Sequence, residues 1–329
     1  MTSAIHPLPH LFLFLLLAAG SLFAGLLFGS VDIPVASIAR VLLSPVAGDT
    51  TSQIVWQLRL PRVLAAFVCG GLLALAGALL QVLLRNPLAD PYILGVSGGA
   101  AVGALTAMLL GWGLVLVNLT SLAGALTAIA IVFGLSFRSG DWNLYRLLLT
   151  GVVLSAGCAA LTTLILTLAP ASDVKGMLFW LMGDVSRATG AEGLSFAWVI
   201  LIILAAISMV FSGNLNVLSL GQMKAKTLGV AVLPLQVGIY FGAALATVAA
   251  LMLAGVIGFV GLIIPHAIRL LGINDYRWLL PLAMLLGGSF LTLADTLART
   301  LWAPQQLPVG VLTALLGVPL LLLLLSRKR

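Results

Sequence analysis

Residues 58–103 read LRLPRVLAAFVCGGLLALAGALLQVLLRNPLADPYILGVSGGAAVG, and this stretch decides the fold of the chain. An apolar run of membrane-spanning length lies between Arg62 and Arg85, since about 20 apolar residues cross the hydrocarbon core of a bilayer. An Arg-Leu-Pro-Arg segment, 59–62, precedes the run, and a proline-rich turn, 85–91, follows it. The two polar motifs are therefore expected on opposite faces of one membrane.

Composition extends this expectation to the whole chain. Of its 329 residues, 62% are hydrophobic and only 8% are charged, whereas about a quarter of a soluble domain is charged. The apolar runs are long and lack the ~10-residue alternating segments of an outer-membrane barrel. Helices satisfy their own backbone hydrogen bonds in lipid. The predicted fold class is therefore an all-α integral membrane protein.

Ten apolar segments of suitable length follow one another. They are 9–29, 62–84, 93–110, 114–137, 145–168, 193–211, 231–254, 256–271, 278–300 and 309–325. The first is expected to be an uncleaved span and not a signal peptide, because the residues before it lack Lys and Arg and the run is long. Residues 34–43 and 173–182 are expected to form short amphipathic segments, the second lying on the membrane surface.

The basic residues predict the orientation of these spans. Ten spans place both termini on one face, and that face would hold ten of the 16 Lys and Arg residues. Because cytoplasmic segments are enriched in Lys and Arg, both termini are predicted to be cytoplasmic. The net charge of +7 is explained by this orientation, and no basic stripe with aromatic residues indicates a nucleic-acid partner.

A short internal match suggests two inverted repeats of five spans. Leu75-Ala76-Gly77 and Leu253-Ala254-Gly255 are each followed by a proline, Pro87 and Pro265, at the same spacing. Inverted repeats are typical of transporters, although coincidence in a Leu-, Ala- and Gly-rich sequence also explains the match. The repeats would be residues 9–168 and 193–325 of a single polytopic domain, 1–329.

Motifs for bond chemistry are missing from the sequence. It has no phosphate-binding loop, no His-Glu-x2-His motif and no cysteine pair at metal-ligand spacing. No metal, cofactor or catalytic residue is therefore predicted on this chain. Asp295 is the main acidic residue inside a predicted span, and it can pair with Arg299 one helical turn on. Ion-coupled carriers usually need ionisable residues in the membrane, so the energy for transport is expected from another chain.

Three arginines are predicted at the outer ends of two spans: Arg59, Arg62 and Arg299. Arginine recognises carboxylates in a planar, bidentate geometry. The cluster therefore suits docking to acidic residues of a soluble protein. The alternative is that the arginines pair with lipid phosphates or with Asp295.

The polar stretch 212–229 is a candidate contact for a partner ATPase. It mixes apolar and polar side chains in a short helix-prone segment. The candidate contact residues are Leu218, Leu220, Gln222, Met223, Lys224, Lys226 and Leu228. The alternative is an ordinary basic cytoplasmic loop.

Two sets of glycines are predicted to pack helices, because small residues let helix backbones approach closely in lipid. The first set is Gly95, Gly99 and Gly103, and the second is Gly255, Gly258 and Gly261.

These motifs together resemble the FecCD-type permeases of binding-protein-dependent ABC importers for iron–siderophore, haem and cobalamin. The resemblance covers nearly the whole chain after residue 50. It rests on the motifs Arg59–Arg62, Arg85–Pro91, Leu94–Ala100, Phe179–Gly183, Gly258–His266 with Arg269, and Leu307–Gly310.

The resemblance implies ten helices in each of two permease copies in the bacterial inner membrane, two cytoplasmic ATPase subunits that bind ATP and Mg²⁺, and a substrate-binding protein outside. It implies that the three arginines dock that protein, that residues 213–229 are coupling helices, and that Asn86, Pro87 and Leu88 form an inner gate. The expected function is ATP-driven import of a bulky metal chelate without bond chemistry on this chain. The alternative is a self-contained ion-coupled secondary transporter.

Overall fold

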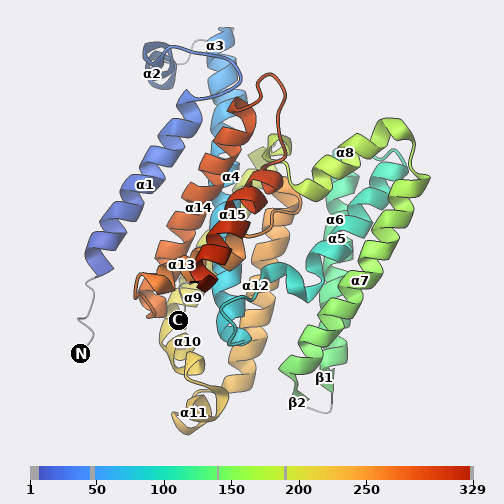
Figure 1. Cartoon of the computed structure of the whole chain (residues 1–329), viewed down its shortest axis with the longest axis vertical. Coiled ribbons are helices and arrows are strands. Elements are labelled where there is room, and N and C mark those ends of the chain that lie inside the picture. The colour runs from blue at the N-terminus through green and yellow to red at the C-terminus, as the bar shows by residue number, and fades with distance from the viewer. Residues whose placement is uncertain (1–6, 45–48, 139–140, 189–190, 327–329) are drawn as a thin grey trace.

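A computed structural model describes residues 7–44, 49–138, 141–188 and 191–326. These residues are helical apart from turns and one antiparallel pair of two-residue strands, β1 (Phe137–Arg138) and β2 (Asp141–Trp142) (Figure 1). Within these ranges, seven long apolar helices have the length to cross a membrane: α1 (Pro7–Leu27), the continuous helix Thr50–Leu83, α6 (Leu114–Ser136), α7 (Leu144–Leu168), α9 (Ala191–Val210), α12 (Val232–Ala254) and α14 (Tyr276–Thr300). Three shorter apolar helices complete the set: α5 (Val96–Leu109), α13 (Val260–Leu270) and α15 (Val309–Ser326). The prediction of an all-helical, multi-pass membrane protein is confirmed.

The remaining short helices lie at the two ends of the bundle (Figure 1). The end opposite the termini holds α2 (Val35–Leu43), α3 (Thr50–Gln53), η1 (Ile54–Arg59), α8 (Ala171–Met182) and η3 (Val185–Arg187). The end nearer the termini holds α10 (Ser212–Ser219), α11 (Gln222–Thr227) and the strand pair. Below, these are called the outer end and the inner end. The segment η2 (Pro91–Leu94) joins α4 to α5.

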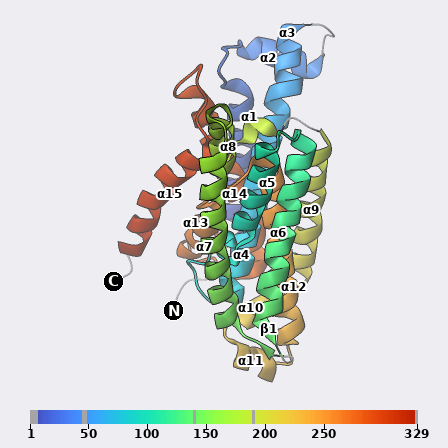
Figure 2. The same cartoon turned by 90° about the vertical axis from the view of Figure 1, so that its right-hand side faces the viewer.

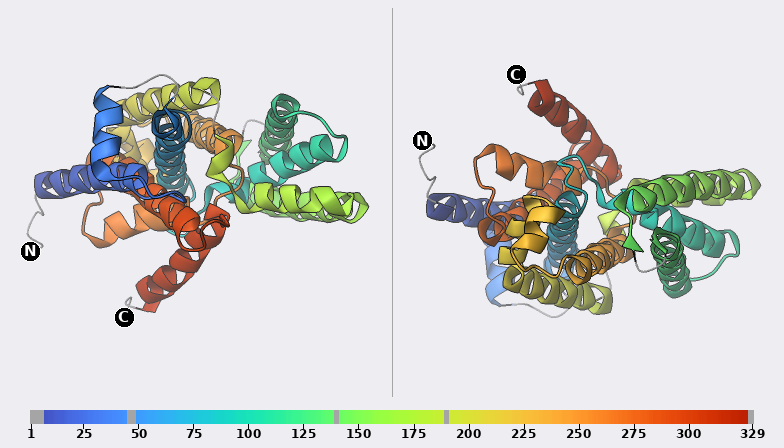
Figure 3. Two further views of the ribbon diagram at one scale, coloured as in Figure 1. Left: turned by 90° about the horizontal axis from the view of Figure 1, so that it is seen from above. Right: turned by 90° about the horizontal axis from the view of Figure 1, so that it is seen from below.

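The helix α4 (Leu60–Leu83) is the centre of the fold. It contacts α1, α9, α12, α13 and α14, which surround it when the molecule is seen from above (Figure 3). Its most apolar window is 94% buried in the protein, against 11% for the corresponding window of α7. The sequence shows no polar face on this helix because the protein covers every side of it.

The central helix begins earlier than the sequence predicted. The Asp49 side chain accepts a hydrogen bond from the Ser52 backbone N–H at 3.0 Å, which caps α3, and α3 continues through η1 into α4. The segment η1 is a π-helix that ends just before Pro61, a residue without a backbone N–H, and wider π turns accommodate such an interruption. Arg59 and Arg62 therefore lie inside a helix, whereas the sequence predicted Arg62 at the start of the span and Arg59 ahead of it.

Glycines allow the helices around α4 to approach it closely. A Cβ atom at Gly77 would lie 1.8 Å from the carbonyl oxygen of Gly261 in α13. A Cβ at Gly70 would lie 2.1 Å from the carbonyl oxygen of Gly287 in α14. Gly261 therefore packs as predicted, but Gly258 does not: nothing lies within 4 Å of where its Cβ would be.

Helices α5, α6 and α7 form a second group beside the α4 cluster (Figures 1 and 3). Gly99 and Gly103 of α5 face the backbone of Gly124 and Thr120 in α6, so both pack as predicted. Gly95 instead ends η2 in a left-handed conformation, φ 74°. The last helix, α15, leans away from the bundle (Figure 2).

The sequence match that suggested the repeat joins positions that differ in structure. Gly77 lies inside α4, whereas Gly255 ends α12 with φ 68°. Likewise, Pro87 lies in a turn, and Pro265 lies inside α13. The match of these residues therefore does not support the two inverted repeats, which remain a prediction.

Candidate functional site

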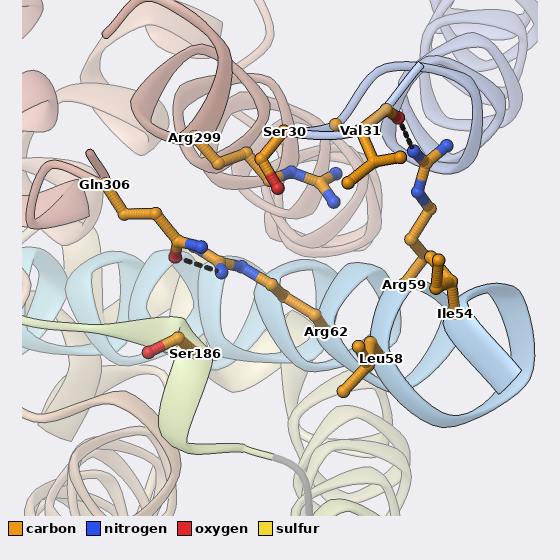
Figure 4. A pocket seen from close by; sticks show the side chains of 10 residues that line it. Ser30, Val31, Ile54, Leu58, Arg59, Arg62, Ser186, Arg299 and Gln306 are labelled. Carbon is orange, nitrogen blue, oxygen red and sulfur yellow. Dashed lines mark hydrogen bonds between the residues drawn. The ribbon is translucent and has the colours of Figure 1, made fainter. Parts of the chain in front are cut away.

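At the outer end, the three predicted arginines surround one cavity of about 260 Å³ (Figure 4). The arginines come from η1, α4 and α14, and Gln306 from the loop before α15 also lines the cavity. The sequence thus identified residues that are far apart in the chain and adjacent in space.

Arg62 is held by an acidic residue of its own chain. Its Nε and Nη2 donate to the carboxylate of Asp295, and Nη2 lies 2.9 Å from Oδ1. Its Nη1 donates to Oε1 of Gln306 at 2.7 Å. Nε of Arg299 lies 3.7 Å from the second carboxylate oxygen of Asp295. This carboxylate is 1% exposed, so the two arginines neutralise a charge that burial would otherwise make costly.

Arg59 and Arg299 also donate to backbone carbonyl groups at the end of α1. Nη1 of Arg59 lies 2.8 Å from the carbonyl oxygen of Leu26 and 2.9 Å from that of Leu27, and Nη2 donates to Val31. Nη2 of Arg299 donates to Gly25 at 2.6 Å. The last carbonyl groups of a helix lack partners within it, so these arginines tie α1 to α4 and α14.

The internal pairing that the sequence offered as an alternative is therefore present for Arg62 and Arg299. Of the two arginines that pair with Asp295, Arg62 is the more accessible: its side chain is 11% exposed, against 5% for Arg299. Docking of another protein at this cavity stays a prediction, and Arg62 beside Gln306 is the part of the cluster best placed for it.

The polar stretch after α9 folds into two short helices, α10 and α11, at the inner end (Figure 1). The side chains of Leu215 and Leu218, on one side of α10, are buried. Leu218 therefore anchors the helix and cannot contact another protein, contrary to the prediction. The other candidate contact residues form an outward-facing surface, here called the α11 surface: Leu220, Gln222, Met223, Lys224, Lys226 and Leu228.

The α11 surface exposes large apolar side chains beside charged ones. Met223 is 76% exposed and Leu228 is 64% exposed, and Lys224 and Lys226 lie beside them. Exposed apolar side chains with a polar rim are typical of a protein interaction site.

The predicted gate residues lie in the turn between α4 and η2, at the inner end. Oδ1 of Asn86 accepts the backbone N–H of Leu88 at 2.9 Å, which closes a tight turn. Asn86 and Pro87 are exposed, and Leu88 is partly buried. Arg85 adopts a positive φ of 49°, a conformation that side chains other than glycine adopt at some cost in energy. A gating role stays a prediction, and this strained turn is an element that could carry it.

Asp90 closes the same turn. Its Oδ1 accepts the backbone N–H of Tyr92 at 2.8 Å. Loss of contact with water raises the pKa of Asp90 from 3.8 to about 6, and the hydrogen bond from Tyr92 opposes this rise. A carboxyl pKa that is raised on folding means that the folded protein binds the proton more tightly.

We expect Asp90→Asn to stabilise the folded protein at high pH and to leave its stability unchanged at low pH. The proton on Asp90 favours the folded state below pH 3.8, and this contribution is lost as the pH rises through about 6. Asparagine keeps the acceptor for Tyr92 and removes the charge. Thermal unfolding in detergent should show a midpoint several degrees above wild type near pH 8 and an unchanged midpoint near pH 4. An equal shift of the unfolding midpoint at both pH values would contradict a raised pKa of Asp90 in the folded protein.

Four polar residues at the inner end were not among the candidate site residues, although Arg269 belongs to a family motif and Asn216 to the predicted coupling segment. Gln81 is 3% exposed inside α4, and its only sequence signal was a lone amide in an apolar run. It contacts Arg269, which in turn contacts Tyr276. Asn216 of α10 contacts the start of α14. Only the structure brings these residues together, because they come from four helices.

The remaining motif residues lie where the end of α8 meets the end of α12 and the start of α15. A Cβ at Gly310 would lie 2.0 Å from the carbonyl oxygen of Met182, and a Cβ at Gly255 would lie 2.3 Å from that of Trp180. These glycines are required by close backbone contact. No group of three His, Cys, Asp or Glu side chains in the described ranges is arranged to hold a metal ion.

Comparison with known proteins places the chain among bacterial transport permeases. The model of the FecCD transport family matches residues 14–327. The chain is 40% identical over 286 residues to the vitamin B12 import system permease protein BtuC of Escherichia coli O9:H4 (strain HS), covering 84% of each chain. It is 39% identical over 326 residues to the uncharacterized ABC transporter permease protein YvrB of Bacillus subtilis (strain 168), covering 94% of this chain and 91% of that one.

A solved structure agrees with these relatives. A metal-chelate type ABC transporter in an inward-facing conformation superposes with a TM-score of 0.86 and 33% sequence identity, covering 98% of this chain and all of that one. PsaBC from Streptococcus pneumoniae, at 18% identity and a TM-score of 0.54, shares the fold. With a family match over nearly its full length, the chain belongs to the FecCD transport family.

Proposed function

We propose that this chain is the permease subunit of a binding-protein-dependent ABC importer that moves a bulky metal chelate across the bacterial inner membrane. The likeness over 98% of the chain to a metal-chelate type ABC transporter is the main support. Vitamin B12, the cargo named for BtuC, is a chelate of this class. Ferric siderophores and haem are the other candidates.

The partners that we propose fit the two ends of the molecule. The α11 surface is the seat of a cytoplasmic ATPase, one for each of two permease copies, and these ATPases bind ATP and Mg²⁺. The basic residues of the inner end agree with a cytoplasmic location. The arginine cavity at the outer end receives acidic residues of the binding protein. Closure of the ATPases moves α10 and α11, and the two copies then alternate between outward and inward access. The permease itself makes and breaks no bonds.

The alternative of an ion-coupled secondary transporter is less well supported. Such a carrier needs a titratable residue that is free to bind an ion within the membrane. Asp295, the acidic residue inside α14, already pairs with Arg62 and Arg299. Its carboxylate is therefore committed to a structural contact.

Uptake into proteoliposomes tests the proposed function. The permease is reconstituted with an ABC ATPase and a substrate-binding protein from the same organism, and import of cyanocobalamin, ferrichrome-iron and haemin is measured with and without ATP. We expect ATP-dependent import of one of the three. Import that follows an ion gradient without the ATPase would instead support the secondary transporter.

The same vesicles test the α11 surface. We expect Lys224→Glu with Lys226→Glu to abolish import while the permease stays folded, because both lysines are exposed and their reversal places acidic groups at the contact. Lys175→Glu, an exposed lysine of α8 at the outer end, is the matched control. Import at the wild-type rate in the double variant would show that the segment is an ordinary loop.

A further inference from the structure

The inner ends of α10, α13, α14 and α4 are joined by polar contacts that helix packing does not require. The first contact connects α10 to α14. Nδ2 of Asn216 donates to Oδ1 of Asp275 at 2.6 Å, and Oδ1 of Asn216 accepts the backbone N–H of Tyr276 at 2.8 Å. Asn216 thus uses both ends of its amide to hold the first turn of α14.

The next contacts pass from α14 to α13 and α4. Nη2 of Arg269 donates to the hydroxyl group of Tyr276 at 3.0 Å, and its guanidinium carbon lies 5.8 Å from the centre of the tyrosine ring. Nη1 of the same arginine donates to Oε1 of Gln81. Tyr276 and Gln81 are each 3% exposed, so water cannot readily replace these partners.

Gln81 in turn contacts two further segments, the start of α13 and the turn after α4. Its Nε2 donates to the carbonyl oxygen of Leu262 at 3.0 Å and to that of Gly261 at 3.4 Å. Its own backbone carbonyl accepts the N–H of Asn86 at 3.2 Å. The contacts that begin on α10 therefore end on the turn that holds the predicted gate residues.

A cavity beside these residues gives them room to move together. It measures about 210 Å³ and is lined by Gln81, Arg269 and Tyr276, by Arg85 and Pro87 of the turn, and by Ser219 at the end of α10. Breaking one buried hydrogen bond leaves a polar group without a partner, at a cost of about 1–3 kcal/mol. This cost applies to the contacts of the buried Tyr276 and Gln81, and the more accessible contacts of Asn216 join α10 to them.

We propose that Asn216, Tyr276, Arg269 and Gln81 form a hydrogen-bond relay that couples the position of α10 and α11 to the turn 84–90. The inference rests on the proposed function, because it assigns to these positioning residues the transmission of ATPase closure to the gate. The relay acts through other residues and touches neither ATP nor cargo.

The Tyr276→Phe variant tests the relay, because it removes one hydroxyl group and keeps the ring. Tyr240→Phe is the matched control: Tyr240 is also buried, and its hydroxyl donates to the carbonyl oxygen of Ile129 at 3.0 Å, between α12 and α6. Both variants remove one hydrogen bond of a buried tyrosine, and the bond of Tyr240 is the more buried of the two, so a purely structural role predicts an effect in Tyr240→Phe at least as large as in Tyr276→Phe. We expect import per ATP hydrolysed to fall about fivefold or more in Tyr276→Phe, the lower range of usual coupling energies, and to stay at the wild-type value in Tyr240→Phe.

Gln81 provides a rescue experiment in the same assay. Gln81→Met removes both polar ends and should lower import per ATP as Tyr276→Phe does. Gln81→Glu keeps the acceptor for Arg269 but loses the donor to Leu262 and Gly261, so it should recover part of the loss. Import is measured with whichever of cyanocobalamin, ferrichrome-iron and haemin the wild-type complex transports.

A second measurement needs neither ATPase nor cargo, so it separates failure of the relay from failure of the proposed function. Nitroxide labels are placed on Pro87→Cys and Met223→Cys, both exposed sites, in the full-length permease with Cys69 and Cys158 changed to alanine. The relay predicts a narrow distance distribution that Tyr276→Phe broadens and Tyr240→Phe does not. Wild-type coupling or an unchanged distribution in Tyr276→Phe would overturn the inference. Failure of wild-type import with a broadened distribution would reject the proposed function alone.

Discussion

The Gly77→Ala substitution should prevent the chain from reaching its folded state. The added methyl group would lie 1.8 Å from the carbonyl oxygen of Gly261 and 2.6 Å from its Cα. Both atoms belong to backbone, which cannot rotate aside as a flexible side chain can. Helix α13 would have to move away from α4, and the loss of that contact would leave buried surface unpacked along both helices.

The measurement is the yield of monodisperse permease after membrane extraction. We expect almost none for Gly77→Ala. Gly134→Ala is the control: this glycine lies in α6 with nothing within 4 Å of the added Cβ. Alanine favours helix over glycine, so the control should be as stable as wild type or slightly more stable. Normal yield of Gly77→Ala would show that the α4–α13 contact is looser than described.

The Arg62→Leu substitution should also lower stability strongly, because it removes the main partner of the buried Asp295 carboxylate. It leaves the buried carboxylate of Asp295 with Arg299 alone, at an Nε–Oδ2 separation of 3.7 Å. Removing one member of a buried ion pair usually costs about 3–5 kcal/mol, whereas replacing both by apolar residues is often nearly neutral. The double variant Arg62→Leu/Asp295→Leu removes the stranded carboxylate but leaves Arg299 without its acidic partner, so it should recover only part of the stability lost in the single variant.

Thermal unfolding of wild type, Arg62→Leu, Asp295→Leu and the double variant gives the coupling energy between the two positions. The same set separates structure from docking at the outer end. If Arg62 acts mainly in the fold, stability and import recover together in the double variant. If it also docks the binding protein, the double variant is stable and still does not import. Additive losses of stability would contradict the ion pair.

The sequence was sufficient for the parts of this molecule that depend on composition and periodicity. Long apolar runs indicate spans wherever the chain meets lipid, and the Arg and Lys distribution indicates the face of the termini. Helix bounds were less accessible. The capping bond of Asp49 and the π turns before Pro61 carry a helix through a polar stretch that composition alone describes as a loop.

The site was predictable only in part. Sequence reasoning found the outer arginines because the residue type and the position at span ends are informative. It did not place Leu218 inside the protein, because the burial of one side of α10 depends on α4 and α14. It passed over Gln81 because a single polar residue in an apolar run has no evident role until its partner Arg269, 188 residues away, is known. It passed over Tyr276 because its partners Arg269 and Asn216 lie on other helices.

The central helix has one further consequence. Residues 50–83 form a continuous rod of about 50 Å at the usual rise per residue, longer than the roughly 30 Å core of a bilayer. Its outer part bears Arg59 and Arg62, and Gln81 stands near its inner end. Gly70 and Gly77, both in the inner half of the rod, bring it into backbone contact with α14 and α13. Because neither contact leaves space for an added methyl group, the rod can tilt only if α13 and α14 move with it, so the outer arginines and Gln81 belong to one closely packed unit.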